Sequence, residues 1–259
     1  DPKIVILTPG HLNSAYYEHS FLADLMGVEL VQGSDLFVSN NITYIKTTEG
    51  PQKVDIIYRR IDDEYLDPLY YKNDSLLGVP GIINSYKTEN INICSAPGAG
   101  LADDKAVYTF MPEIIRFYLG EEPILKNIKT WRCYDKKELS YVISNLEKLV
   151  VKEVHGSGGY GMLIGSKASK KELSSFKNKI LMSPDNFIAQ PILQLSTVPI
   201  FDKSLLSNRH VDLRPFSLIG HKKFKLVSGG LTRVALKKNS LIVNSSQGGG
   251  VKDTWVLAD

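Results

Sequence analysis

Short apolar runs separated by polar turns fill the first hundred residues. Each run has the length of a buried strand and is bounded by turn-forming residues. Between the first two runs, Ser14 can cap a helix that extends to about Met26 and stops at Gly27. A strand, a helix and a strand at this spacing predict a βαβ unit over a parallel sheet, and hence one α/β domain over residues 1–100. The predicted strands lie at 3–7, 28–31, 54–58 and 91–94, with a hairpin of 36–38 and 42–45.

After residue 100 the pattern changes to helices and antiparallel strand pairs. Apolar positions along 101–119 predict a long helix with one apolar side, and Asp135 can cap a helix at 136–146. Two apolar strands then enclose a glycine-rich loop, which predicts a β-hairpin. The other expected elements are the hairpin strands 149–154 and 162–164, a helix at 170–180, a strand at 187–192, and strand pairs 214–218 with 225–226 and 231–236 with 241–243.

Composition excludes several classes of protein. The chain has 259 residues, 43% of them hydrophobic, and 31 basic against 28 acidic side chains give a net charge of +3. This is the balance of a globular protein, and no apolar run approaches the roughly 18–20 residues of a membrane helix. Interspersed charges disfavour nucleic acid as a partner, and the spacing of Cys94 and Cys133 excludes a disulfide scaffold. We expect a cytoplasmic protein without a nucleic-acid or membrane partner, and, because it opens at Asp1, a fragment of a longer one.

The glycine-rich loop at 156–161 is the first candidate for chemistry. Glycines allow a phosphate to approach the backbone closely, and successive N–H groups can surround an anion. Lys152 precedes the loop inside an otherwise apolar strand, where its ammonium must find an anion or reach solvent. Taken alone, the loop is as typical of a flexible turn, and Lys152 as typical of a solvent-facing lysine on an edge strand.

The order of several motifs along the chain resembles the ATP-grasp superfamily, and most closely its circularly permuted type 2 family, whose members are often labelled glutathionylspermidine-synthase-like. The resemblance covers essentially the whole chain. The motifs that carry it are Thr-Pro-Gly-His-Leu-Asn-Ser at 8–14, Tyr-Arg-Arg-Ile-Asp-Asp at 58–63, Asp-Asp-Lys-Ala at 103–106, Lys-Glu-Val-His-Gly-Ser-Gly-Gly at 152–159, Arg-His-Val-Asp-Leu-Arg at 209–214, Thr-Arg-Val at 232–234 and Asn-Ser-Ser-Gln-Gly-Gly-Gly at 244–250.

The resemblance implies an α/β (α+β) chain with a Rossmann-like pre-ATP-grasp domain at 1–100. Two ATP-grasp subdomains with antiparallel sheets follow at 101–192 and 193–259, the second completed by an upstream segment. It also implies ATP as cofactor. Mg²⁺ is expected too, but its acidic ligands belong to that upstream segment, and no residue of this chain is assigned to the metal.

By the same resemblance, Lys105 and Lys152 neutralise nucleotide phosphates, Arg233 stabilises the transferring phosphoryl group, and Asn244 reaches a phosphate oxygen or the metal. Asp212 and Arg214 alternate on one strand, so both can face a cleft, although a structural ion pair involving Asp212 is an open alternative. The remaining residues assigned to ATP are Glu153 beside the loop, Gly156, Ser157, Gly158 and Gly159 within it, and Gln190 and Ile192 at the adenine.

The first domain is expected to bind the substrates. Residues 8–14 follow the first strand, where open α/β sheets bind ligands. Arginines at the end of another strand can clamp a carboxylate, and the aspartates after them can bind an amine. A solvated ion-pair network is an equally good interpretation of those charges. The substrate candidates are His11, Asn13, Ser14, Arg59, Arg60 and Asp62.

Together these features predict an ATP-dependent carboxylate–amine ligase that acts through an acyl-phosphate on small-molecule substrates. The alternative is a nucleotide-binding module without ligase turnover that acts in a complex with a protein partner.

Overall fold

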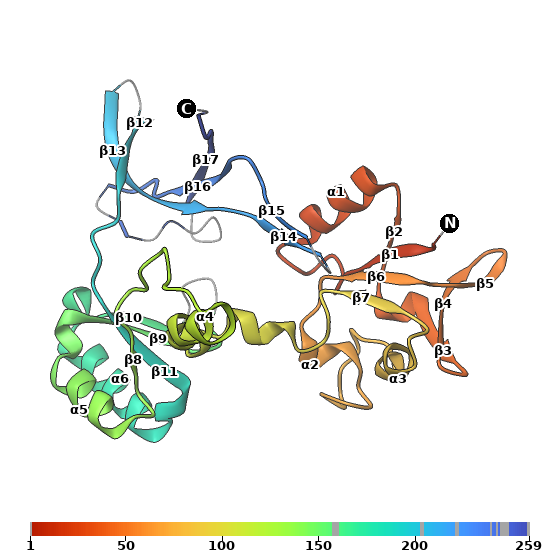
Figure 1. The fold of residues 1–259 in the computed structure, drawn as a ribbon, viewed down its shortest axis with the longest axis horizontal. Helices are drawn as coiled ribbons and strands as arrows, with labels where there is room; N and C mark the ends of the chain where they lie inside the picture. The colour runs from red at the N-terminus through yellow and green to blue at the C-terminus, as the bar shows by residue number, and fades with distance from the viewer. Residues whose placement is uncertain are drawn as a thin grey trace. The chain divides into compact units, whose positions relative to one another are not determined.

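The computed structural model describes residues 2–156, 161–202, 205–220, 223–238, 240–241, 243 and 249–257. The chain forms two compact units, Asp1–Asp103 and Asp104–Asp259, hereafter unit 1 and unit 2. Figure 1 shows the helices and strands of both. The finer division of the second unit at residue 192 stays a prediction.

Unit 1 is built on a parallel four-stranded sheet in the order β2-β1-β6-β7. Helix α1 (Tyr16–Met26) connects the first two strands, which confirms the predicted βαβ unit. The central strands are apolar because both faces of such a sheet are covered; Val5, Leu7 and Ile57 are fully buried. The strands are β1 (Ile4–Leu7), β2 (Glu29–Val31), β6 (Ile56–Arg59) and β7 (Asn92–Cys94).

A second, antiparallel sheet completes the core of unit 1. Strands β3 (Leu36–Ser39) and β4 (Ile42–Thr47) form the predicted hairpin, and β5 (Gly50–Lys53) extends it. Asn40 and Asn41 turn the hairpin with positive φ angles of 51° and 59°, as asparagine tolerates. The other elements here are the 3₁₀ turn η1 (Gly33–Asp35), the short helices α2 (Asp63–Leu66) and α3 (Ile82–Lys87), and η2 (Ala99–Asp103).

Two helix predictions are wrong at their beginnings. Ser14 does not cap α1: the N-cap is Ala15, without a side-chain hydrogen bond, whereas Gly27 ends the helix as predicted with φ 64°. The long helix expected from residue 101 is instead the end of η2, a further 3₁₀ turn η3 (Val107–Phe110), and then the helix α4 (Met111–Leu119). A proline near the start of α4 explains its late beginning, because proline fits the first turn of a helix but not its interior.

Unit 2 contains one well-packed sheet, in the order β10-β9-β11-β8, with all neighbours antiparallel. Helices α5 (Lys136–Ser144) and α6 (Lys170–Met182) contribute to the core of buried side chains with Val151, Leu163 and Ala189. Asp135 caps α5 as predicted, accepting hydrogen bonds from two backbone N–H groups of the first turn. The strands are β8 (Trp131–Arg132), β9 (Leu149–Glu153), β10 (Met162–Ile164) and β11 (Phe187–Pro191), with 3₁₀ turns η4 (Leu146–Lys148), η5 (Gly165–Lys167) and η6 (Pro184–Asn186).

The carboxyl-terminal strands form another sheet, in the order β12-β13-β16-β17. The predicted pairing of 231–236 with 241–243 is wrong, because β16 pairs with β13 and β17 instead. A local sequence pattern cannot predict these partners, because neither of them directly adjoins β16 in the sequence. The bounds are β12 (Thr197–Asp202), β13 (Leu205–Arg214), β16 (Gly230–Val234) and β17 (Gly250–Thr254), with a hairpin of β14 (Ser217–Ile219) and β15 (Phe224–Leu226).

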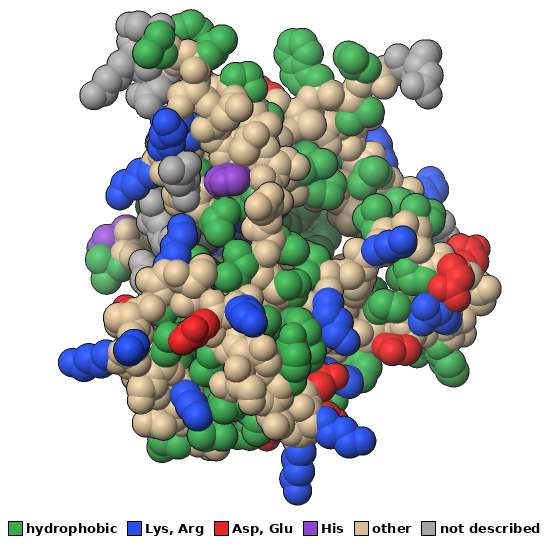
Figure 2. All heavy atoms as spheres, turned by 90° about the vertical axis from the view of Figure 1, so that its left-hand side faces the viewer, with side chains coloured by type: hydrophobic (Ala, Val, Ile, Leu, Met, Phe, Trp, Pro, Cys, Tyr) green, Lys and Arg blue, Asp and Glu red, His purple; other side chains and the backbone are tan. Residues whose placement is uncertain are grey.

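Large apolar side chains of this last part of the chain reach the surface. Leu206, Leu213, Val251 and Trp255 are all more than half exposed. Figure 2 shows hydrophobic side chains on the face it presents, between Lys and Arg side chains that are scattered over that face. No helix in the described part of the chain has the length and apolarity needed to cross a membrane.

One buried carboxylate accepts several backbone hydrogen bonds from the segment between α2 and α3 and from the start of α3. Asp67 is fully buried and accepts backbone hydrogen bonds from Leu69 at 2.9 Å, Gly81 at 3.1 Å and Ile83 at 3.0 Å. We expect Asp67→Ala to lower the free energy of unfolding by about 3 kcal/mol or more, because it leaves several buried donors without an acceptor. Urea denaturation checks this, with Asp74→Ala, a substitution at an exposed position, as the control. An equal, small effect of both changes would contradict this role of Asp67.

Candidate functional site

The two faces of the β10-β9-β11-β8 sheet carry different side chains. Val151 and Ala189 face the core beneath α5 and α6. Lys152 and Gln190 lie on the opposite face, because side chains alternate along a strand and β9 pairs antiparallel with β11. The nucleotide candidates on these strands therefore gather on the face away from the core.

Lys152 is anchored on this face by a chain of hydrogen bonds. Its Nζ donates to Gln190 Oε1 at 2.8 Å, and Gln190 Nε2 donates to Thr130 Oγ1 at 2.9 Å. Burial, and secondarily repulsion from Lys105, lower the pKa of Lys152. A bound anion would offset both effects, so this is a place where a phosphate group stabilises the charged lysine.

Lys105 reaches the same region from a distant part of the chain. Its Nζ donates to the backbone oxygen of Val154 at 3.2 Å and to that of Gly156, and its backbone N–H donates to Val154 O at 3.3 Å. The ammonium is thereby held at the start of the glycine-rich loop. Two lysines on separate elements near one loop form a site suited to a polyanion.

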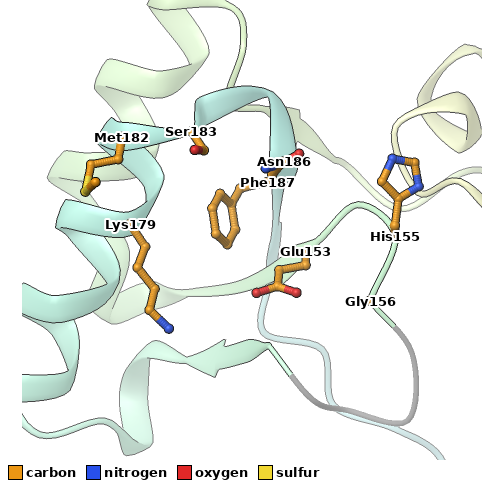
Figure 3. Close-up of a pocket in the computed structure, with 8 residues that line it drawn as sticks. All are labelled: Glu153, His155, Gly156, Lys179, Met182, Ser183, Asn186 and Phe187. Atoms are coloured by element: carbon orange, nitrogen blue, oxygen red, sulfur yellow. The ribbon is translucent and has the colours of Figure 1, made fainter. Parts of the chain in front are cut away.

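Glu153, the next residue in β9, belongs to the other side of the sheet. It lines a hollow of about 580 Å³ together with His155, Lys179 and Phe187. In the view of Figure 3, the Phe187 ring lies between the side chains of Lys179 and Glu153. Gly161 packs on Glu153 so closely that a Cβ atom would lie 2.5 Å from the Glu153 Cδ. The structure thus separates Glu153 from Lys152, although both were assigned to ATP.

Two further residues expected to bind the nucleotide lie near the ends of the neighbouring strands. Gly156 is half-buried at the start of the loop, and Ile192 is half-buried just after β11. Ser157, Gly158, Gly159 and Asn244 lie outside the described residues.

A charged cluster lies across β13 and β16. Arg233 donates from Nε to Asp212 Oδ1 at 2.9 Å, and Asp212 and Arg233 are directly opposite in the strand register. Arg214 Nη2 is 3.4 Å from Asp212 Oδ2. Hydrogen bonding from Arg233 lowers the pKa of Asp212, which keeps this carboxylate ionised. Asp212 therefore orients the guanidinium that was assigned to the phosphoryl group.

The substrate candidates of unit 1 surround the carboxyl ends of β1 and β6. In the sheet order β2-β1-β6-β7, the chain moves from β1 to one neighbour and later returns on the other side. These two strands therefore flank the topological switch point, where open α/β sheets bind ligands. His11, Asn13 and Ser14 are exposed in the loop after β1.

A buried pair of side chains supports that loop. Thr8 Oγ1 and His19 Nδ1 are 2.9 Å apart, and the Gly10 N–H donates to Thr8 Oγ1 at 3.2 Å. Gly10 has φ 100°, and a Cβ there would lie 2.7 Å from Gln32 Oε1, so the loop needs glycine at this position.

The charges after β6 fall into two classes. Arg59 donates to the backbone oxygens of Ser95 at 2.6 Å and Ile61 at 2.9 Å, and lies 2.6 Å from Asp63 Oδ1. The Arg59 side chain is only 7% exposed, so these contacts within the fold occupy it. Arg60 and Asp62 are exposed instead.

Sequence reasoning missed three residues that shape these sites: Thr130, His19 and Arg209. Thr130 carries no local signal, since only the fold brings it to Gln190. Arg209 is 3% exposed and donates to the backbone oxygen of Leu236 at 3.1 Å. Its place in the Arg-His-Val-Asp motif was the available signal for Arg209.

The described residues include no group of three or more His, Cys, Asp or Glu side chains that could hold a metal ion. The paired lysines, by contrast, fit the phosphates of a nucleotide.

Comparison with known proteins decides the family. The circularly permuted ATP-grasp type 2 family matches residues 1–235. The chain belongs to this family. The mixed α/β architecture, with one parallel and several antiparallel sheets, is thus that of an ATP-grasp fold.

The ATP-grasp relatives are longer than this chain. An uncharacterised protein of Synechocystis is 52% identical over 256 residues, which are 99% of this chain and 53% of that protein. A Frankia alni protein, provisionally named a glutamate–cysteine ligase, is 40% identical over 99% of this chain and 30% of its own length. This chain thus spans about half the length of the Synechocystis relative. A solved ATP-grasp ligase, PsnB, is 12% identical with a TM-score of 0.45, covering 98% of this chain and 90% of its own.

The buried His19 makes the stability of unit 1 depend on pH. Burial, and secondarily the positive charge of Arg60, lower the pKa of His19. The unfolded chain then binds the proton more readily, so stability is complete above about pH 6.5 and falls as the pH drops below it. Urea denaturation between about pH 5 and 8 checks this. We expect His19→Gln to reduce the pH dependence of the free energy of unfolding. His11→Gln, at an exposed position, is the control and should leave this dependence intact. Equal pH profiles for the two variants would contradict the role of His19.

Proposed function

We propose that this chain is the nucleotide- and substrate-binding part of an ATP-dependent carboxylate–amine ligase. The observation that carries the proposal is the convergence of Lys105 and Lys152 on the start of the glycine-rich loop. Membership of the ATP-grasp family supports it, as does the provisional name of the Frankia alni relative, which describes the joining of a carboxylate to an amine.

The proposed reaction has two steps. A carboxylate oxygen of the substrate attacks the γ-phosphorus of ATP, which gives an acyl-phosphate and ADP. The amine then attacks the acyl carbon, phosphate leaves with the bonding electron pair, and the amine nitrogen loses a proton. The protein contributes mainly positioning and charge neutralisation, as in other phosphoryl transfers.

The proposed roles combine the contacts described above with the family resemblance. Lys105 and Lys152 hold phosphates, and Gln190 keeps the Lys152 ammonium in position while bordering the adenine with Ile192. Arg233, oriented by Asp212, stabilises the transferring phosphoryl group, and unit 1 binds the carboxylate and amine substrates. Asn244 and the glycines of the loop keep the roles that the family resemblance gives them.

We further propose that a segment outside these 259 residues completes the nucleotide-binding half and supplies acidic ligands for Mg²⁺. Two observations support this. Large apolar side chains such as Leu213 and Val251 are exposed on the β12-β13-β16-β17 sheet, and the Synechocystis relative is about twice the length of this chain.

The test of the function is titration of the chain with ATP by isothermal calorimetry. We expect Lys152→Met to weaken ATP binding by roughly 10- to 100-fold, because a hydrogen bond to a charged group contributes about 1.5–3 kcal/mol. Lys148→Met, at an exposed position on η4, is the matched control and should bind as the unchanged protein does. If Lys152→Met binds ATP as tightly as that control, the proposed nucleotide site is wrong.

Turnover separates the two functional alternatives. In a protein that includes the proposed additional segment, hydroxylamine should trap the acyl-phosphate as a hydroxamate when ATP and a carboxylate substrate are present. ATP binding without any hydroxamate or ADP would favour the nucleotide-binding module instead.

A further inference from the structure

The motif Arg-Arg-Ile-Asp-Asp at 59–63 contains two basic and two acidic side chains, and the fold uses only one of each. Arg59 and Asp63 form a 2.6 Å ion pair, and Asp63 Oδ2 also accepts the backbone N–H of Gly98 at 3.1 Å. These bonds join the end of β6 to the segment after β7. Arg59 and Asp63 therefore secure two neighbouring strand ends to each other.

The other two charged residues of the motif, Arg60 and Asp62, are exposed. Ile61 between them is 6% exposed and belongs to the hydrophobic core of unit 1. Asp62 has extended backbone angles, φ −73° and ψ 157°. Arg60 and Asp62 flank this buried residue and are both exposed. The two opposite charges thus lie two residues apart on the surface of one loop.

Neither charge is engaged elsewhere within the part of the chain that the structure describes. The structure records no ion pair and no side-chain hydrogen bond for Arg60 or Asp62 there, and Asp62 does not cap α2. Both residues follow β6 at the switch point of the parallel sheet, next to the loop that Thr8 and His19 support. The influence of Arg60 on the pKa of His19 shows that its charge lies close to that loop.

We propose that Arg60 and Asp62 form a recognition site for a free α-amino acid. Arg60 binds the α-carboxylate, for which a guanidinium offers two parallel N–H donors, and Asp62 binds the α-ammonium. A ligand that carries both charges on one carbon satisfies both side chains at once. This inference rests on the proposal that unit 1 binds the substrates, and it names their chemical class.

The test uses L-glutamate as the probe, with two analogues that each lack one charge. Glutarate lacks the α-ammonium, and 4-aminobutanoate lacks the α-carboxylate. The full chain is titrated with each compound by calorimetry, with and without ADP. We expect the unchanged protein to bind L-glutamate at least about tenfold more tightly than either analogue.

Variants assign each charge to its residue. Arg60→Gln should remove the preference for L-glutamate over 4-aminobutanoate and keep the preference over glutarate, whereas Asp62→Asn should do the reverse. Because both side chains are exposed, thermal unfolding should be unchanged in these variants. Arg59→Gln, by contrast, should lower the unfolding temperature. Arg116→Gln, which removes an exposed pair with Glu122, is the control for loss of a surface charge.

ATP titration of the same samples separates the two proposals. If ATP binds normally but L-glutamate does not bind, with or without ADP, the amino-acid site is wrong and the nucleotide site stands. Equal L-glutamate binding by Arg60→Gln, Asp62→Asn and Arg116→Gln also overturns the amino-acid site. If neither ATP nor L-glutamate binds, both proposals fail.

Discussion

The half-buried ammonium of Lys152 requires polar partners, and much of unit 2 is arranged to provide them. Gln190 comes from β11, and Thr130, just before β8, holds Gln190 in turn. Each partner depends on strands that pair only when the sheet is assembled. The packed core on the other face keeps those strands in register, so the geometry around Lys152 is a product of the hydrophobic face as much as of the polar one.

Unit 1 also contains a buried cation that needs polar partners, the guanidinium of Arg59. The two adjacent arginines differ in their surroundings. Arg59 is enclosed by backbone oxygens and Asp63, whereas Arg60 is exposed to solvent. Arg59 is the last residue of β6 and lies beside the acceptors of the segment after β7, whereas Arg60 is the first residue beyond the strand. In the charged motif at 59–63, Arg59 and Asp63 therefore stabilise the fold, whereas Arg60 and Asp62 remain accessible to solvent.

Sequence patterns predicted the elements whose signals are local. The parallel strands of unit 1 are continuous apolar runs, and Asp135 and Gly27 mark helix ends with their own side chain or backbone. In the β12-β13-β16-β17 sheet, β12 and β13 form a local hairpin, whereas β16 pairs with more separated segments. Many apolar side chains of this sheet are exposed, so an apolar pattern does not indicate burial there.

The candidate site shows the same limit. Lys152 was identifiable as a charge inside an apolar strand, and strand alternation would also have separated it from Glu153. The Thr130 contact and the choice between Arg59 and Arg60 needed the fold, since nothing in the local sequence distinguishes them. The family resemblance supplied the roles of residues such as Asn244, which the local pattern alone does not define.

The parallel arrangement of unit 1 also constrains how this chain is made. β1 is a central strand, and Ile4 pairs with Ile56 on one side and Val5 with Glu29 on the other. Contacts between residues so distant in sequence form slowly and only after the intervening chain exists. During synthesis, the first strand therefore leaves the ribosome long before its second neighbour and must stay unaggregated until then. The parallel topology of unit 1 thus leaves one edge of β1 without its partner strand until β6 has been synthesised.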